Sequence, residues 1–300
     1  MLNSSMSRRS ALVTLTSMVP CAFAIDPIVR PIKGSRLKLG LAAYSLRKYL
    51  DLKNPSNPKM DLMAFADFAA ANGCDAIEPT SYYFQDTSIA GILKLKNHCA
   101  RLGLEITGSA VGNNFCLKDE GQRQNQVKLV TDWLDKVSML GGRTLRVFAG
   151  TVAKGQTEEQ CREWTVTCLK QACDYAEKVG VFVALENHGG ITATSKQLLS
   201  LVKSVNHPWF GVNFDSGNFH TEDPYGDLEA IAPYAVVTQF KSEIQPKGSP
   251  KQNADYERLL EILRKSYYSG YVILEYEAAQ EPLVGIPTEL KAIAKALHRN

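Results

Sequence analysis

The chain has 300 residues, of which 45% are hydrophobic and 22% are charged. This balance is typical of a folded globular protein and excludes a largely disordered chain. Length alone does not separate two average domains from one α/β barrel, because such barrels commonly use 200 to 300 residues.

The first 24 residues are predicted to be a secretory signal peptide. Arg8 and Arg9 precede a moderately apolar run, and Ala22-Phe23-Ala24 offers a small-residue cleavage site. The paired arginines resemble a twin-arginine export signal, with a Sec-type signal as the alternative. The apolar run is too short for a permanent membrane anchor. We therefore expect a periplasmic or secreted protein without a stable anchor.

Removing residues 1–24 takes away two arginines and no acidic residue, so the formal net charge falls from +3 to +1. This near-neutral charge argues against a nucleic-acid partner. The remaining cysteines show no CxxC spacing for zinc and are expected to be mostly buried thiols, although disulfides are permitted in the periplasm. They are Cys74, Cys99, Cys116, Cys161, Cys168 and Cys173.

After a linker over residues 25–36, strand-like and helix-like segments alternate. Strands are expected at Leu37–Tyr44, Gly73–Glu78, Leu104–Ser109, Thr144–Phe148, Val181–Glu186, Trp209–Phe214, Ala235–Phe240 and Tyr271–Leu274. Helices are expected at Lys59–Asn72, Ile89–Leu102, Glu120–Leu140, Thr157–Val179, Thr194–Val205, Tyr225–Ile231, Ala254–Ser266 and Pro287–His298. Eight units in this order predict an α/β fold with a single (β/α)8 barrel over 37–300. An open, doubly wound sheet is the alternative, but no glycine-rich nucleotide motif follows any strand.

Oxygen donors stand at the ends of four consecutive strands, the fifth to the eighth. They are Glu186, Asp215, Gln239 and Glu275. In a barrel of this kind the functional face collects the C-terminal ends of the strands. Three carboxylates and an amide oxygen suit Mn²⁺ or Mg²⁺ better than Zn²⁺. Such an ion polarises a carbonyl while a glutamate moves a proton.

Other polar or aromatic side chains at the same predicted face are candidates for binding substrate. They are Tyr44, Glu78, Arg146, His188, Asn218 and Lys241. The aromatic run Tyr82-Tyr83-Phe84 follows the second strand and suits stacking on a sugar ring, with a packed loop as the alternative. For Glu186 the alternative is a structural ion pair, for Asp215 a turn cap, and for Gln239 a satisfied polar group without metal contact.

The strand-end motifs resemble those of the xylose-isomerase-like barrels, which include sugar epimerases and endonuclease-IV-type enzymes. They are Ala43-Tyr44-Ser45-Leu46-Arg47, Leu145-Arg146-Val147-Phe148, Leu185-Glu186-Asn187-His188-Gly189-Gly190, Asn213-Phe214-Asp215-Ser216-Gly217-Asn218, Gln239-Phe240-Lys241 and Leu274-Glu275-Tyr276. The resemblance spans about residues 37–296 and implies that Glu186 and Glu275 bind the metal and act as the two acid/base groups. It also implies that Asp215 completes the site.

Two positions depart from the family pattern. Many relatives carry histidines where this chain has Asn218 and Gln239, and the endonuclease branch needs several histidines for a zinc cluster. The leading hypothesis is therefore an exported, metal-dependent isomerase or epimerase that removes a proton beside a sugar carbonyl. A lyase or hydratase acting on 3-keto sugars or glycosides by β-elimination is one alternative. A non-catalytic carbohydrate-binding barrel is another. An oligomer is compatible with the sequence.

Overall fold

The structure is a computed structural model that describes residues 27–28, 30, 33–53 and 59–298. The predicted signal peptide lies outside the described residues, and so does part of the predicted linker. Within that linker, Ile28 donates a backbone hydrogen bond to the carbonyl of Pro233, and Arg30 donates to the carbonyl of Ala235. The described part of the linker therefore lies against the segment that leads into one of the barrel strands.

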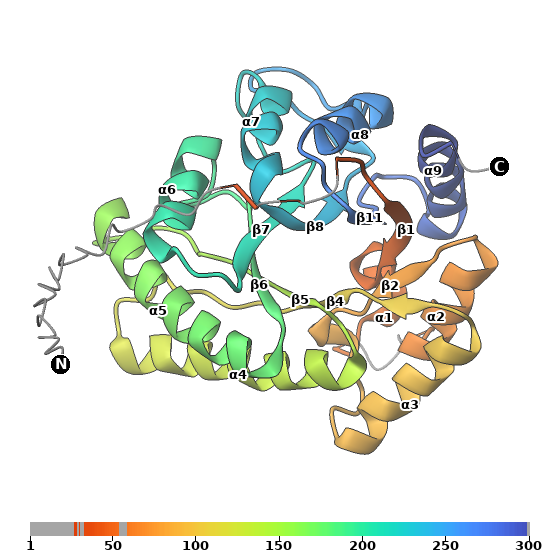
Figure 1. Cartoon of the computed structure of the whole chain (residues 1–300), viewed down its shortest axis with the longest axis horizontal. Coiled ribbons are helices and arrows are strands. Elements are labelled where there is room, and N and C mark those ends of the chain that lie inside the picture. The colour runs from red at the N-terminus through yellow and green to blue at the C-terminus, as the bar shows by residue number, and fades with distance from the viewer. Residues whose placement is uncertain (1–26, 29, 31–32, 54–58, 299–300) are drawn as a thin grey trace, which may run out of the picture.

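The strands form one parallel sheet that curves into a nearly closed barrel (Figure 1). Its strands are β1 (Leu37–Ala42), β2 (Ala76–Glu78), β3 (Glu105–Ile106), β4 (Gly108–Ala110), β5 (Thr144–Val147), β6 (Phe182–Glu186), β7 (Phe210–Asp215), β8 (Ala235–Phe240) and β11 (Gly270–Leu274). Their order is β3-β2-β1-β11-β8-β7-β6-β5-β4. Because only Thr107 separates β3 from β4, the two ends of the sheet belong to one interrupted strand. The predicted single α/β barrel is confirmed.

Helices surround the ring of strands in Figure 1. They are α1 (Arg47–Leu50), α2 (Leu62–Ala71), α3 (Ile89–Arg101), α4 (Glu120–Leu140), α5 (Glu158–Val179), α6 (Ser195–Val205), α7 (Pro224–Ile231), α8 (Tyr256–Lys265) and α9 (Pro282–Ala296). Local sequence explains their ends. Thr157 and Gln160 form a capping box at the start of α5, and Gly180 ends that helix in the left-handed conformation with φ 71°.

Two local predictions were wrong, and one pair of strands was not predicted. The last helix begins at Pro282, because this proline already occupies the first turn, and Pro287 lies within the helix. The second strand begins at Ala76 rather than Gly73, because Gly73 has φ 76° and belongs to a turn. The antiparallel pair β9 (Glu243–Ile244) and β10 (Gln252–Asn253) was not predicted, because strands of two residues carry no periodic signal.

The barrel interior explains how the strands aim polar side chains at one end. Small and apolar residues from β1, β2, β6, β8 and β11 form an inner cluster of Ala42, Ala76, Ala184, Val237, Tyr271 and Ile273. Side chains two positions apart on a strand share a face. The residues two positions beyond Ala76, Ala184, Val237 and Ile273 are therefore also directed inward, and they are polar: Glu78, Glu186, Gln239 and Glu275.

The expectation for the cysteines can be compared with the described residues. The six cysteines there are buried, as predicted. Among the described helices, none combines the length and apolarity that crossing a membrane requires.

Candidate active site

A polar cavity of about 200 Å³, called here the first cavity, lies at the C-terminal ends of the strands. It is lined by Tyr44, Tyr82, Arg146, Phe148, Glu186, His188, Asn218, Lys241, Glu275 and Glu277. Most of the predicted site residues are thus brought together. The exceptions are Glu78, Asp215 and Gln239, which are buried beside the cavity rather than lining it.

One wall of the first cavity is a buried ion pair between β5 and β6. Nε of Arg146 lies 2.9 Å from Oε2 of Glu186, and both side chains are almost fully buried. Nδ2 of Asn218 donates to the other oxygen of Glu186 at 2.9 Å. Arg146 also donates to the carbonyl of Val111 and lies over the ring of Phe148, 4.0 Å from its centroid. These contacts hold the guanidinium and the carboxylate in one geometry.

A second cluster of charges surrounds Lys241, directly after β8. Its ammonium forms an ion pair with Oε2 of Glu275. It also lies 3.3 Å from Oδ2 of Asp215 and 3.3 Å from Oε2 of Glu277. The Lys241 side chain is only 8% exposed, whereas that of Glu277 is 38% exposed. One ammonium therefore bridges carboxylates that end β7 or follow β11, the two strands on either side of β8.

A third group, formed by two amides and a carboxylate, lies deeper in the barrel. Nε2 of Gln239 donates to Oε1 of Glu78 at 2.7 Å, and Oε1 of Gln239 accepts from Nδ2 of Asn213 at 2.8 Å. Within the described part of the chain, Oε2 of Glu78 is buried without a hydrogen-bond partner. Burial, with Glu275 adding to it, raises the pKa of Glu78 to about 7.

The strand register explains why Gln239 lies apart from Glu275. Gln239 pairs with Ile273 on β11, and Phe240 pairs with Leu274. Extending this register places Glu275 level with Lys241 rather than with Gln239. The polar residues at this strand end, Gln239 and Lys241, were both predicted to face the site. Their polarity alone does not indicate which of the two stands beside Glu275.

The two glutamates of the first cavity have different protonation behaviour. Burial raises the pKa of Glu186 to about 7, although Arg146 opposes the shift. Burial also acts on Glu275, but the ammonium of Lys241 and the guanidinium of Arg146 outweigh it and hold the pKa of Glu275 below its ordinary value. Two carboxyl groups with separated pKa values are typical of an acid and a base serving one reaction.

Aromatic and imidazole side chains complete the first cavity. The ring of His188 lies against that of Phe148 with centroids 4.3 Å apart, and burial together with Arg146 lowers the pKa of His188. Tyr82 lines the cavity, whereas Phe84 packs against Trp133. The predicted aromatic run therefore divides between the cavity and the core. Neither Phe148 nor Glu277 is among the predicted site residues. Each lies two positions after one of them, Arg146 and Glu275 respectively.

The predicted Mn²⁺ or Mg²⁺ ion can be compared with the arrangement of its four predicted ligands. Glu186 faces the guanidinium of Arg146, and Asp215 and Glu275 both face the ammonium of Lys241. The polar atoms of Gln239 are engaged by protein partners. No group of three or more His, Cys, Asp or Glu side chains in residues 33–53 and 59–298 is arranged to hold a metal ion. The residues as arranged do not fit the ion, because protein cations already contact its three predicted carboxylate ligands.

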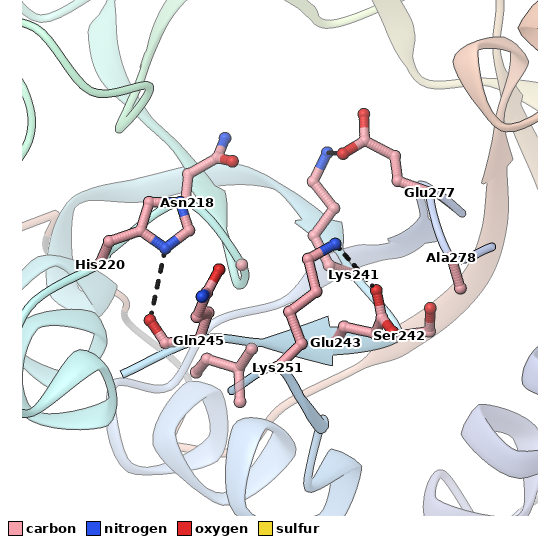
Figure 2. A pocket seen from close by; sticks show the side chains of 11 residues that line it. Asn218, His220, Lys241, Ser242, Glu243, Gln245, Lys251, Glu277 and Ala278 are labelled. Atoms are coloured by element: carbon pink, nitrogen blue, oxygen red, sulfur yellow. Dashed lines mark hydrogen bonds and ion pairs between the residues drawn. The ribbon is translucent and has the colours of Figure 1, made fainter. Parts of the chain in front are cut away.

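A second cavity, also of about 200 Å³, adjoins the first (Figure 2). Asn218, Lys241 and Glu277 line both cavities. The unpredicted strand β9 contributes Glu243 and Ile244 to the second cavity, where Lys251 forms an exposed ion pair with Glu243 at 3.1 Å. In Figure 2 the side chain of Lys241 extends toward Glu277.

Comparisons with known proteins agree with this architecture. The solved structure of a 3-keto-D-glucoside 4-epimerase from E. coli superposes with a TM-score of 0.69 at 17% identity, covering 87% of this chain and 100% of that one. The D-psicose 3-epimerase from Clostridium cellulolyticum H10 gives 0.65 at 17% identity, covering 87% and 97%. A probable 3-DHS dehydratase from Bacillus anthracis gives 0.61 at 17% identity, covering 88% and 99%.

These identities are low, so the likeness to the solved structures concerns the fold. None of the curated proteins compared matches the sequence significantly. The model of one protein family, described as xylose isomerase-like TIM barrel, matches residues 66–297, which is most of the chain. The chain therefore belongs to the xylose isomerase-like TIM barrel family.

Proposed function

We propose that this chain is an enzyme that isomerises or epimerises a carbohydrate by moving a proton on a carbon next to a carbonyl group. The observation that carries the proposal is the pairing of Glu186 and Glu275 in one cavity, each held by a buried cation. Because β7 and β8 separate β6 from β11 in the sheet, the two glutamates approach the cavity from different strands.

The proposed reaction has two proton transfers. Glu275, whose pKa is held low, is ionised and takes the proton from the carbon, and the bonding electrons move onto the carbonyl oxygen to form an enolate. Glu186, whose pKa is about 7, then gives a proton to carbon as the carbonyl reforms. Arg146 and Lys241 line the cavity and stabilise the negative charge on the oxygen between these two steps. No step passes through a metal ion, because the predicted ligands do not fit one.

The polar lining of the cavity and the solved structures with this fold support the proposed substrate class. Tyr44, Tyr82 and Phe148 give aromatic side chains to the lining, and Asn218 and His188 give hydrogen-bonding groups. Two of the similar structures are epimerases, one named for a keto-glucoside and one for D-psicose. They support a small keto-sugar as the substrate.

The experiment is incubation of the purified protein with keto-hexoses and 3-keto-glucosides in D₂O, followed by NMR. We expect deuterium at the carbon next to the carbonyl and a rearranged sugar of the same formula apart from the deuterium. A protein that binds these sugars yet exchanges no carbon-bound proton would contradict the proposal and favour a non-catalytic carbohydrate-binding barrel.

β-Elimination is a second candidate, and the second cavity is the observation that favours it. An enolate formed in the first cavity expels an oxygen leaving group from the neighbouring carbon as Glu186 protonates it, and the adjoining second cavity has room for that group. The similar dehydratase structure is consistent with such chemistry on this fold. The same NMR samples separate the two reactions, since a released aglycone or an unsaturated sugar indicates elimination.

Export to the periplasm is part of the proposed function and rests only on the predicted signal peptide over residues 1–24. We expect a reporter fused to these residues to leave the cytoplasm. Replacing Arg8 and Arg9 by lysine should block export if the signal is of the twin-arginine type and leave it intact if the signal is of the Sec type.

A further inference from the structure

The end of β8 places a fixed positive charge among the site carboxylates. The ammonium of Lys241 pairs with Glu275 and lies 3.3 Å from Oδ2 of Asp215. That oxygen is buried and has no hydrogen-bond partner within the described residues, and the ammonium of Lys241 supplies its ionic contact. Asp215 and Glu275 were both predicted to hold a divalent ion, and the ammonium lies between them.

The surrounding backbone makes room for the lysine and fixes its starting point. The backbone nitrogen of Lys241 donates to Oγ of Ser216 at 2.8 Å. The next residue is Gly217, where an added Cβ would lie only 2.5 Å from Cγ of Lys241 and 2.8 Å from its Cβ. Only glycine therefore leaves the space that the lysine stem occupies as it passes the end of β7.

The charges of the site point to the same role. Two buried cations, Arg146 and Lys241, accompany the predicted carboxylate ligands, and both line the first cavity. An added divalent ion at those carboxylates would lie close to the ammonium and repel it in a buried, weakly screened environment. The ion and the ammonium therefore compete for the same oxygens.

We propose that Lys241 is a built-in cation that takes the place of a divalent metal ion and stabilises the negative charge that forms on the carbonyl oxygen of the substrate. This inference rests on the proposed proton transfer for its chemical role. Lys241 forms no covalent bond with the substrate. It lines the first cavity, where a positive charge lowers the energy of an enolate more than that of the neutral carbonyl compound.

Binding of Mn²⁺ tests the inference without relying on activity. Free Mn²⁺ is followed by its EPR signal while wild-type protein, Lys241→Met, Lys241→Arg and Lys128→Met are added. We expect the wild type to leave the signal unchanged and Lys241→Met to bind Mn²⁺, because the ammonium no longer competes for Asp215 and Glu275. Lys241→Arg keeps the charge and should not bind. Lys128→Met removes only an exposed helix pair with Asp132 and is the matched control.

Turnover gives an independent measurement. We expect wild-type activity to survive removal of metal by a chelator, and Lys241→Met to lose about 100-fold or more in kcat, as when one group that stabilises an oxyanion is removed. Stoichiometric binding of Mn²⁺ to the wild type, or activity that is lost with the chelator and regained with Mn²⁺, would overturn the inference and leave the proposed sugar chemistry standing.

The two proposals fail in distinguishable ways. If no keto-sugar is turned over with or without Mn²⁺, the proposed function fails, while the Mn²⁺ titration still decides whether the lysine excludes the ion. If Lys241→Met does not fold, as judged by circular dichroism, the Mn²⁺ titration of the wild type is the remaining test, and stoichiometric binding there overturns the inference. A folded Lys241→Met that binds no Mn²⁺ would show that the lysine is not the competing cation.

Discussion

Two lysine–glutamate pairs near the same cavity differ mainly in burial. Lys241 and Glu275 have side chains only 8% and 6% exposed, whereas Lys251 and Glu243 are 58% and 30% exposed. Both lysines line the second cavity (Figure 2). An exposed pair is screened by water and salt, so it contributes little to stability and fixes no field. A buried pair keeps its charges in place, which is what stabilising a reacting oxyanion requires.

The largest expected effect comes from the base in the buried pair. Glu275→Gln keeps the shape of the side chain but cannot accept the proton, so we expect kcat to fall on the order of 10³-fold with the fold intact. Steady-state kinetics and circular dichroism measure the two quantities. The matched control is Glu261→Gln, an exposed glutamate on α8 whose partner is Lys265. Full activity in Glu275→Gln would show that the glutamate of the buried pair is not the catalytic base.

Breaking the other buried pair should lower stability. Arg146→Met leaves the carboxyl of Glu186 buried without its ionic partner, so we expect a loss of about 3–5 kcal/mol in the free energy of unfolding. Urea titration measures it. Adding Glu186→Gln to the same variant should recover part of the loss, because a neutral amide is less costly to bury. If Arg146→Met changes the free energy of unfolding by less than about 1 kcal/mol, this buried pair contributes no more than an exposed pair does.

The buried carboxyl of Glu78 predicts a pH dependence of stability. Its pKa in the folded protein is about 7, above the ordinary value of 4.5. Between these values the folded state holds a proton that the unfolded state releases, so its contribution to stability is present below about pH 4.5 and is lost as the pH rises through 7. Replacement by Gln should remove up to about 3 kcal/mol of this dependence. Unfolding curves of wild type and Glu78→Gln that change in parallel between pH 5 and pH 8 would contradict this.

The smallest effect is expected at the exposed pair. Lys251→Met should change the free energy of unfolding by less than about 1 kcal/mol, and the change should vanish in high salt. Thermal unfolding at low and high salt measures it. A loss comparable with that of Arg146→Met would show that exposure does not separate the two kinds of pair.

Local sequence signals predicted most of the fold. The buried apolar strands, the helix caps such as Thr157 and the glycine stops such as Gly180 are decided within a few residues, so the order of strands and helices could be predicted. The same alternation directed Glu186 and Glu275 toward one end of the barrel. Both line the cavity, and their acid/base roles stay a prediction.

What could not be predicted depends on contacts between distant strands. The register of β8 against β11 decides that Lys241, not Gln239, stands level with Glu275. The hydrogen bond that links Gln239 to Glu78 joins residues 161 positions apart. Neither feature leaves a pattern in the local sequence, so the sequence predicts Gln239 as a ligand and Lys241 as a substrate contact but not their positions relative to Glu275.

The most direct test of the proposed proton transfer is NMR of a keto-sugar incubated in D₂O with wild-type protein and with Glu275→Gln. The proposed reaction predicts that the wild type introduces deuterium at the carbon beside the carbonyl and forms an epimer or isomer, and that the variant does so on the order of 10³-fold more slowly. Product formed by the wild type without any carbon-bound deuterium, or equal exchange rates for the two proteins, would contradict it.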